Sequence, residues 1–104
     1  MIKIIQNKIP SIVALLKKHK VKRAYAFGSV VKGDFNQDSD VDLLIAFEDN
    51  MDPVEYGQHY FDLADQLEEL LQRPVDLITE ASLKNPYFIK RLNETKIPLY
   101  EWSH

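Results

Sequence analysis

The chain has 104 residues, of which 45% are hydrophobic and 28% are charged, and it contains no cysteine. This balance predicts one globular domain over residues 1–104, without a disulfide framework or a thiolate metal site. No apolar run is long enough to cross a bilayer and residues 1–5 lack the apolar core of a secretory signal, so a cytoplasmic location without membrane attachment is expected.

The net charge of −3 conceals an uneven distribution. Residues 1–33 contain eight Lys or Arg and no Asp or Glu, whereas residues 34–104 contain sixteen acidic and five basic residues. Either basic and acidic elements simply neighbour each other in the fold, or the basic part faces an anionic ligand such as a triphosphate or an acidic partner. A general nucleic-acid surface is not expected, because the acidic remainder would repel phosphates.

The first predicted element is an amphipathic helix. Its apolar residues recur at spacings of three and four: Ile5, Ile9, Ile12, Val13 and Leu16. Pro10 suits a first helical turn, and the basic residues 17–20 suit the negative C-terminal end of a helix. A strand is predicted next, over residues 21–27, and Gly28 ends it. Alternation places Ala24 and Ala26 on one face of this strand and Val21, Tyr25 and Phe27 on the other.

Residues 28–39 are polar and contain two of the three glycines, which predicts a loop with room for one helical turn. A second strand is predicted over residues 40–47. Asp52 as cap and Pro53 at the first helical position then predict a helix that runs to about Gln72. The apolar stripe expected to be buried on this helix consists of Tyr60, Leu63, Ala64, Leu67, Leu70 and Leu71.

After Pro74, a third strand is predicted over residues 75–78. A last helix should begin at Asn85-Pro86, end near Asn93 and bury its apolar side chains, Phe88, Ile89 and Leu92. Residues 97–102 predict a strand confined to a sheet edge by Pro98. The fold class is therefore α/β (α+β), a small mixed sheet of about four strands with helices packed against it. An exposed edge leaves a homo-oligomer or hetero-oligomer possible.

Three aspartates stand where strand packing alone would not place them. Asp40 and Asp42 are two residues apart in a strand, so they project to the same side with carboxylates roughly 6–7 Å apart. Asp76 lies in a separate apolar strand. Such a group of acids calls for a divalent cation, and Mg²⁺ is the expected one because it prefers hard oxygen ligands and shares them with phosphates. Two such ions can assist an in-line phosphoryl displacement.

Gly28 and Ser29 lie at the end of the first strand, and ten residues separate Ser29 from Asp40. A glycine there lets the backbone approach a phosphate closely, and the following hydroxyl and amide favour an anion. Lys32 offers a cation for a triphosphate, and Gly33 relaxes the same loop. A Gly-Ser pair alone predicts nothing; its spacing to the acids makes it informative.

The set formed by Gly28-Ser29, Asp40-Val41-Asp42 and Asp76 resembles the motif of nucleotidyltransferases of the DNA polymerase beta superfamily. Over nearly its whole length the chain looks most like the minimal nucleotidyltransferases (MNT), single small domains encoded beside HEPN proteins as toxin–antitoxin pairs. This family usually has arginine where the chain has Lys32, a change that keeps the charge but loses the two-pronged contact with phosphate.

The resemblance implies that Asp40 and Asp42 are metal ligands, and that Asp76 is a third ligand or the base that takes the acceptor proton. It also implies that Gly28 and Ser29 hold a nucleoside triphosphate. ATP would be the donor, with two Mg²⁺ ions. AMP would be transferred to a tyrosine of a HEPN ribonuclease toxin, which silences the toxin. The chain is too short to grip a primer and template, so a templated polymerase is not expected.

An alternative is a catalytically inactive antitoxin, a binding module that neutralises its partner by occlusion. The predicted edge strand near Pro98 and the aromatic residues Tyr100 and Trp102 favour this alternative. The acids at alternate positions of residues 34–42 also imitate a calcium-binding EF-hand loop. That imitation fails, because Ser39 replaces the required glycine and Ile45 replaces the bidentate glutamate.

Histidines and helix aromatics complete the candidates. His19, His59 and His104 have no metal-ligand spacing with one another and are expected at the surface. The aromatic residues Tyr56, Tyr60 and Phe61 fit core and helix-surface positions better than a platform for a nucleobase.

Overall fold

The computed structural model describes residues 3–28 and 40–101. In chain order the elements are α1 (Lys3–Lys18), β1 (Val21–Phe27), β2 (Val41–Phe47), α3 (Pro53–Leu71), β3 (Val75–Thr79), the short 3₁₀ helix η1 (Glu80–Ser82), α4 (Pro86–Thr95) and β4 (Ile97–Glu101). The predicted α+β class with a four-stranded mixed sheet is confirmed. The predicted loop over residues 29–39 lies outside the described residues.

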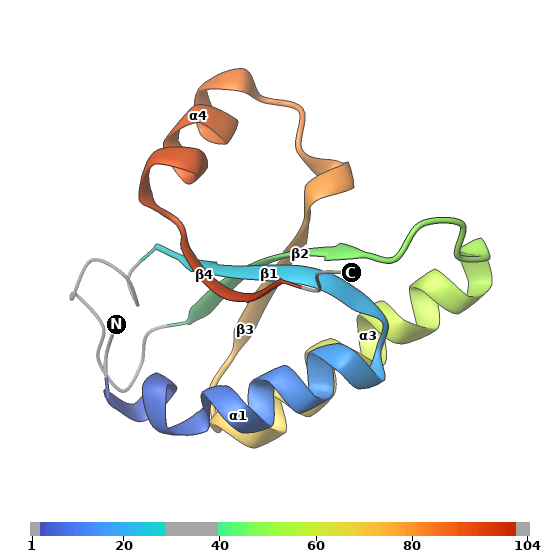
Figure 1. Ribbon diagram of the computed structural model, residues 1–104, viewed down its shortest axis with the longest axis vertical. Coiled ribbons are helices and arrows are strands. Elements are labelled where there is room, and N and C mark those ends of the chain that lie inside the picture. Colours follow the sequence, from blue (N-terminus) through green and yellow to red (C-terminus); the bar gives the residue numbers. More distant parts are fainter. Residues whose placement is uncertain (1–2, 29–39, 102–104) are drawn as a thin grey trace.

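The four strands of the described sheet are arranged in the order β3-β2-β1-β4 (Figure 1). β1 runs antiparallel to β2 and to β4, whereas β2 and β3 are parallel. A parallel connection needs a crossover, and α3 supplies it. The edge position predicted for the strand around Pro98 is confirmed, because β4 pairs with β1 on its inner side.

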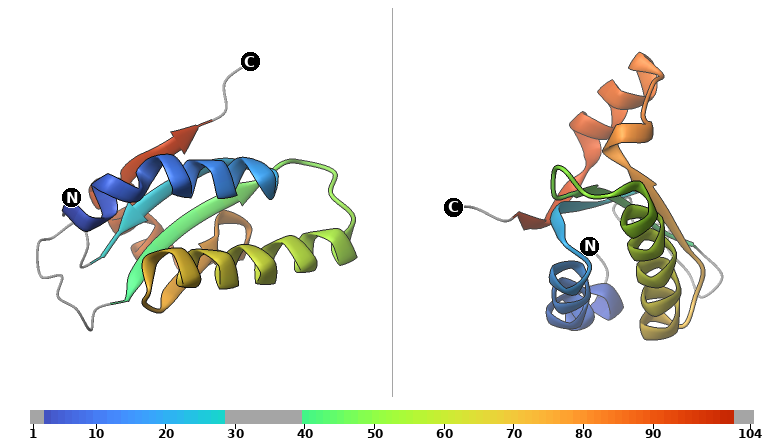
Figure 2. Two further views of the ribbon diagram at one scale, coloured as in Figure 1. Left: turned by 90° about the horizontal axis from the view of Figure 1, so that it is seen from below. Right: turned by 90° about the vertical axis from the view of Figure 1, so that its right-hand side faces the viewer.

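Helices cover both faces of the sheet (Figure 2). α1 and α3 lie side by side on one face and close the main core, whose fully buried residues include Ile12, Leu16, Leu43, Ile45, Leu63 and Leu67. α4 lies on the opposite face, where a smaller buried cluster consists of Phe27, Leu44 and Leu92. We refer to these as the two-helix face and the α4 face.

The sequence predicted α3 most accurately. Asp52 caps it by accepting a hydrogen bond from the Val54 amide (3.1 Å), and Pro53 occupies the first turn. The helix ends at Leu71, and the following cap residue, Gln72, adopts a left-handed conformation with φ of 55°. Half of the predicted stripe is buried, namely Leu63, Leu67 and Leu71, whereas Tyr60, Ala64 and Leu70 are partly buried against the same core.

Three local predictions are wrong. Pro10 lies inside α1 and not in its first turn, because the helix already begins at Lys3. Val21 faces the main core together with Ala24 and Ala26, because a register shift between Val21 and Arg23 moves it to the other face. Phe88 is not buried and keeps 39% of its surface exposed, although Leu92, on the same helix, is buried as predicted.

The histidine prediction also needs correction. His19 is buried, with 4% of its surface exposed, and not at the surface. Its Nδ1 lies 3.0 Å from Nδ1 of His59, and its Nε2 lies 2.9 Å from Oε1 of Gln66. The packing of α1 against α3 encloses a residue that follows α1 directly, and sequence spacing cannot reveal such a contact. His104 lies outside the described residues.

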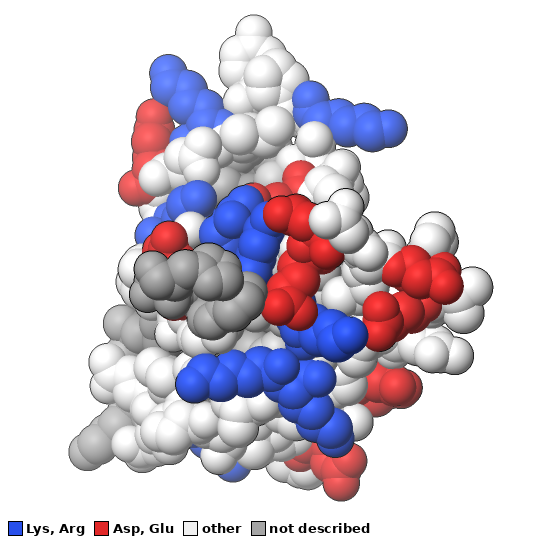
Figure 3. Space-filling view, turned by 45° about the vertical axis from the view of Figure 1, so that its right-hand side comes forward, with Lys and Arg blue, Asp and Glu red and all other residues white. Residues whose placement is uncertain are grey.

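The basic N-terminal part and the acidic remainder are neighbours, as the simpler interpretation predicted. Lys20, Lys22 and Arg23 form ion pairs with Glu55, Asp49 and Glu80 at 3.0, 2.9 and 2.7 Å. Figure 3 shows basic and acidic side chains next to each other around a hollow of about 470 Å³, which is lined in part by Lys22, Arg23 and Glu80. These three cations are therefore already engaged by carboxylates. Within the described ranges, none of the helices has the length and apolar character to span a membrane.

Candidate active site

Two of the three candidate acids are direct neighbours in the sheet. Asp42 on β2 and Asp76 on β3 are register partners in the parallel pair, so their Cα atoms lie about 4.8 Å apart, the spacing of neighbouring strands. The residues after them, Leu43 and Leu77, both enter the main core. Because side chains alternate along a strand, both carboxylates must point to the α4 face.

Backbone and side-chain contacts fix this register. The Val41 amide donates to the Pro74 carbonyl (3.0 Å), which joins the start of β2 to the residue before β3. On the outer flank of β3, the Val75 amide donates to the Glu68 carboxylate (2.9 Å). The Tyr60 hydroxyl donates to the Leu77 carbonyl (2.6 Å). Side chains of α3 therefore satisfy edge groups of β3 and hold Asp76 in place.

The electrostatics of Asp42 reflect its neighbours. Burial raises the pKa of the Asp42 carboxyl above its usual value, and the negative charges of Asp76 and Asp40 raise it further. Asp40 immediately precedes β2 and is exposed, as is Asp76. The fold thus concentrates negative charge around a half-buried carboxylate, and a bound cation would relieve this repulsion.

Gly28 closes the site from the β1 side. It follows Phe27 at the end of β1 and has a φ of 75°, a left-handed conformation that favours glycine. A Cβ at this position would overlap Oδ2 of Asp42. The end of β1 therefore passes directly beside the carboxylate, as close approach of backbone to a ligand site requires. Ser29, Lys32 and Gly33, the other predicted triphosphate contacts, lie outside the described residues.

The donor set around Asp42 fits Mg²⁺. In residues 3–28 and 40–101, no three His, Cys, Asp or Glu side chains form a ready-made metal site. Mg²⁺, however, is usually held by one or two carboxylates together with substrate phosphates and water. Adjacent carboxylates whose mutual repulsion raises the pKa of Asp42 are hard oxygen ligands with unsatisfied negative charge, which is the chemistry this ion prefers.

Aromatic side chains beside the acids were not predicted from sequence. Phe27 is the register partner of Asp42 across β1 and β2. Its ring packs against Phe88 of α4, with 6.4 Å between the ring centroids and 78° between the ring planes. The position of Phe27 directly before Gly28 could have indicated an aromatic residue near the site. Its contact with Phe88, however, depends on tertiary structure.

At the other end of the α4 face, Arg23 of β1 binds Glu80 of η1 through two hydrogen bonds of 2.8 and 2.7 Å. This pair lowers the pKa of the Glu80 carboxyl and raises that of the Arg23 guanidinium. Sequence analysis missed it because the two residues are far apart along the chain. Tyr25, between this pair and the acids, lies under the Lys96 ammonium, 4.1 Å from its ring centroid.

The mixed sheet, with paired carboxylates at one end and a tight glycine beside them, defines a nucleotidyltransferase fold. Comparison with known proteins agrees. The family model "Nucleotidyltransferase domain" matches residues 9–99, so the chain belongs to this family and is a nucleotidyltransferase.

A Methanocaldococcus jannaschii relative, MJ1379, provisionally named a protein adenylyltransferase, is 39% identical over 83 residues, which are 80% of this chain and 81% of that protein. A solved structure described provisionally as a minimal nucleotidyltransferase has 31% identity and a TM-score of 0.72, with 90% of this chain and 91% of that chain covered. The resemblance to minimal nucleotidyltransferases is therefore confirmed.

The fold also recurs in a complex of tri-AMPylated Shewanella oneidensis HEPN toxin with MNT antitoxin. The matching chain has a TM-score of 0.66 and 22% identity, with 92% of this chain and 71% of that chain covered. At this identity the likeness concerns the fold alone.

Proposed function

We propose that the chain is an Mg²⁺-dependent protein adenylyltransferase that transfers AMP from ATP to a tyrosine hydroxyl of a HEPN toxin, and so acts as its antitoxin. The observation that carries the proposal is the pairing of Asp42 with Asp76 on adjacent strands, next to Gly28. The name of the M. jannaschii relative and the AMPylated toxin in the S. oneidensis complex support the choice of AMP and of a protein acceptor.

Each site residue has a proposed role. Asp40, Asp42 and Asp76 would hold the metal, which when bound would neutralise charge on the phosphates and favour ionisation of the acceptor hydroxyl. Alternatively to binding metal, Asp76 would take the proton of the acceptor hydroxyl, a role that its exposure at the sheet edge supports. Gly28, Ser29, Lys32 and Gly33 would bind the triphosphate, since the missing Cβ of Gly28 lets its backbone come close.

The direction of approach follows from the sheet order. In an in-line displacement the attacking oxygen and the leaving pyrophosphate lie on opposite sides of the α-phosphorus. Gly28 lies on the β1 side of Asp42 and Asp76 on the β3 side. We therefore assign the leaving pyrophosphate to the Gly28 loop and the acceptor to the edge at β3.

Intact mass spectrometry tests this function. The chain would be incubated with Mg²⁺, each of the four NTPs in turn, and the protein encoded by its neighbouring gene, which the proposal requires to be a HEPN protein. We expect AMP adducts on a tyrosine of the HEPN protein with ATP, and none when the chain carries Asp42→Asn. Absence of any nucleotide adduct, or an adduct that persists with Asp42→Asn, would contradict the proposal.

The occlusion alternative predicts a different result. Of its two motivating aromatics, Trp102 lies outside the described residues, and Tyr100 is half-buried with the Lys17 ammonium 5.7 Å from its ring centroid. If occlusion is sufficient, a variant with Asp40, Asp42 and Asp76 all changed to Asn should still restore growth of cells that express the toxin. The catalytic proposal predicts that this variant fails.

A further inference from the structure

We propose that Phe27 and Phe88 form a wall against which the base of the donor nucleotide stacks. The inference rests on the proposed function, because it takes the carboxylates of Asp42 and Asp76 as the reaction centre. It adds a binding role for two aromatic residues. It also assigns the β1 side of that centre to the nucleobase and the β3 side to the protein acceptor.

The wall stands directly beside the carboxylates. Phe27 and Asp42 are opposite each other in the antiparallel pair, so their side chains project from the same face of the sheet, about 5 Å apart at Cβ. Phe88 extends this surface away from the sheet. It belongs to α4, which lies over that face, and its ring contacts the ring of Phe27. Within the described residues, these rings are therefore neighbours of a group attached to a phosphate at Asp42.

Part of this aromatic surface is free. In an edge-to-face pair one ring presents its edge to the other, so each ring retains at least one face that its partner does not cover. Phe27 is nearly buried, at 8% exposure, whereas Phe88 keeps 39% of its surface exposed. Phe88 can therefore offer a ring face to a flat aromatic group without repacking the core.

The β1 side and the β3 side of Asp42 differ in their surroundings. This difference indicates which side receives the nucleobase and which receives the protein acceptor. On the β3 flank, Asp76 is exposed and an open hollow of about 500 Å³ lies between α3 and β3, lined by Asp76, Tyr60 and Phe61 among others. A protein acceptor is bulky and needs such an open edge. On the β1 flank, an inner strand lies under α4, and the partly exposed ring of Phe88 suits a flat group.

The chemistry of transfer leads to the same choice. The α-phosphorus carries three groups that must be placed: the leaving pyrophosphate, the attacking hydroxyl and the nucleoside. The pyrophosphate, on the Gly28 side, and the attacking hydroxyl, on the Asp76 side, lie on one line through the α-phosphorus. The nucleoside must therefore point away from this line. Among the described residues, the rings of Phe27 and Phe88 adjoin this line on the α4 face, to which the Asp42 carboxylate points, and stacking on such rings tolerates different bases.

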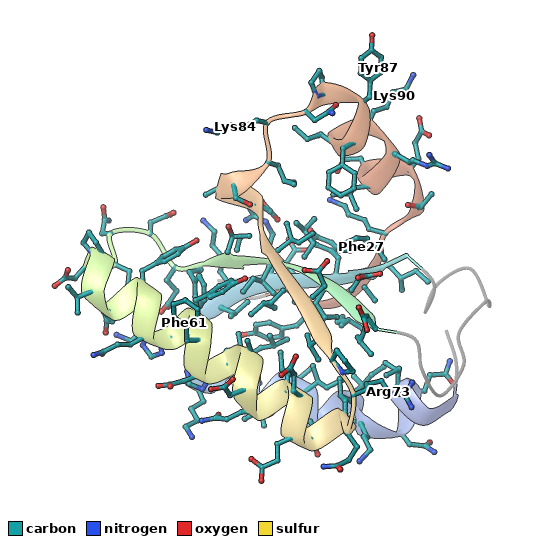
Figure 4. The ribbon with its side chains drawn as sticks, turned by 180° about the vertical axis from the view of Figure 1, so that it is seen from behind. Phe27, Phe61, Arg73, Lys84, Tyr87 and Lys90 are labelled. Atoms are coloured by element: carbon teal, nitrogen blue, oxygen red, sulfur yellow. The ribbon has the colours of Figure 1, made fainter. Side chains whose placement is uncertain are left out.

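A matched control is available in the same chain. Phe61, on α3, is 67% exposed, and Figure 4 shows it on the side of the sheet away from Phe27. Phe61→Ala removes exposed aromatic area, as Phe88→Ala does. It does so on the β3 side, which we assign to the protein acceptor.

Calorimetric binding of two probes in the presence of Mg²⁺ tests the inference: α,β-methylene-ATP, which carries a base, and inorganic tripolyphosphate, which does not. Phe88→Ala and Phe88→Leu should each weaken binding of α,β-methylene-ATP by about tenfold and leave tripolyphosphate binding unchanged. Phe88→Trp should retain the affinity, and Phe61→Ala should not alter it. Phe88→Leu keeps an apolar contact with Phe27, so a loss seen in both variants does not reflect loosened packing.

Unchanged affinity for α,β-methylene-ATP in Phe88→Ala would overturn the inference, as would an equal loss for both probes. An increase in KM for the protein acceptor with an unchanged KM for ATP would also overturn it, because the wall would then serve the acceptor. A wild-type chain that binds neither probe would overturn the proposed function as well. Failure of the two claims can therefore be distinguished.

Discussion

Gly28 and Asp42 lie so close together that a Cβ on the glycine would clash with the carboxylate oxygen Oδ2. The end of β1 and the start of β2 are joined in sequence by residues 29–39, which hold the remaining predicted triphosphate contacts. The close approach thus couples the proposed phosphate loop to the proposed metal site, and either part should respond to changes in the other.

The change Gly28→Ala should destabilise the fold and weaken nucleotide binding. The new Cβ would displace the Asp42 carboxylate, and the left-handed φ of 75° costs about 1–2 kcal/mol for a residue with a side chain. Urea denaturation measures the loss. Gly57→Ala is the matched control, because a Cβ there meets nothing within 4 Å in the helix α3. It should stabilise the protein by about 0.5–1 kcal/mol; equal effects of both changes would contradict this account.

The change Asp42→Asn should abolish transfer and yet stabilise the metal-free protein. Removing one charge relieves repulsion with Asp76 and Asp40, a gain on the order of 1 kcal/mol for partly exposed groups. Thermal unfolding at pH 7 with a chelator should show a rise of a few degrees. A lower melting temperature without metal would mean that these acids do not repel each other.

The same carboxyl predicts a pH dependence. Because the pKa of Asp42 is raised in the folded protein, the folded state binds more protons than the unfolded state between the ordinary Asp pKa and the raised one. The free energy of unfolding from this group should therefore fall as pH rises through that window. Denaturation at several pH values should show this slope in the wild type and its absence in Asp42→Asn, with Mg²⁺ omitted throughout.

The contribution of Glu80 to the free energy of unfolding should change with pH in the opposite direction to that of Asp42. Its bidentate contact with Arg23 lowers its pKa, so it stabilises the fold above the ordinary Glu pKa. This stabilisation is lost as pH falls through the lowered pKa. Glu80→Gln should cost about 1 kcal/mol at pH 7, given that both side chains are partly exposed, and progressively less as pH falls below the ordinary Glu pKa. A cost that does not change with pH would contradict the assignment.

The contact of buried His19 with partly exposed His59 should contribute to stability. The change His19→Leu removes a ring that contacts both His59 and Gln66, and it should cost about 1–3 kcal/mol. In a double-mutant cycle with His59→Leu, the two costs should be less than additive, because each change removes the same contact. Full additivity, measured by urea denaturation, would indicate that the rings do not interact.

Sequence patterns predicted those parts of the fold that depend on local periodicity. The apolar stripe and the caps identified α3, and short apolar runs identified β2 and β3. The sequence did not predict that Val21 faces the main core. A bulge between Val21 and Arg23, for which the sequence gives no signal, reverses the alternation in β1. The burial of His19 was missed because its partners lie on another helix.

The candidate site divides in the same way. Spacing alone predicted that Asp40 and Asp42 share a face, because that is a property of one strand. The neighbouring position of Asp76 depends on the register between β2 and β3, and the approach of Gly28 depends on a close packing contact. The wall of Phe27 and Phe88 joins β1 to α4, so it became apparent only in the assembled structure.

The central claim is that Asp42 and Asp76 hold a divalent cation together with the triphosphate. Crystals grown with Mn²⁺ in place of Mg²⁺ and with α,β-methylene-ATP would locate the ion by its anomalous scattering. We predict a peak within about 2.5 Å of carboxylate oxygens of Asp42, adjacent to Asp76 and to the phosphates. A bound triphosphate whose metal lies away from both carboxylates would contradict the account.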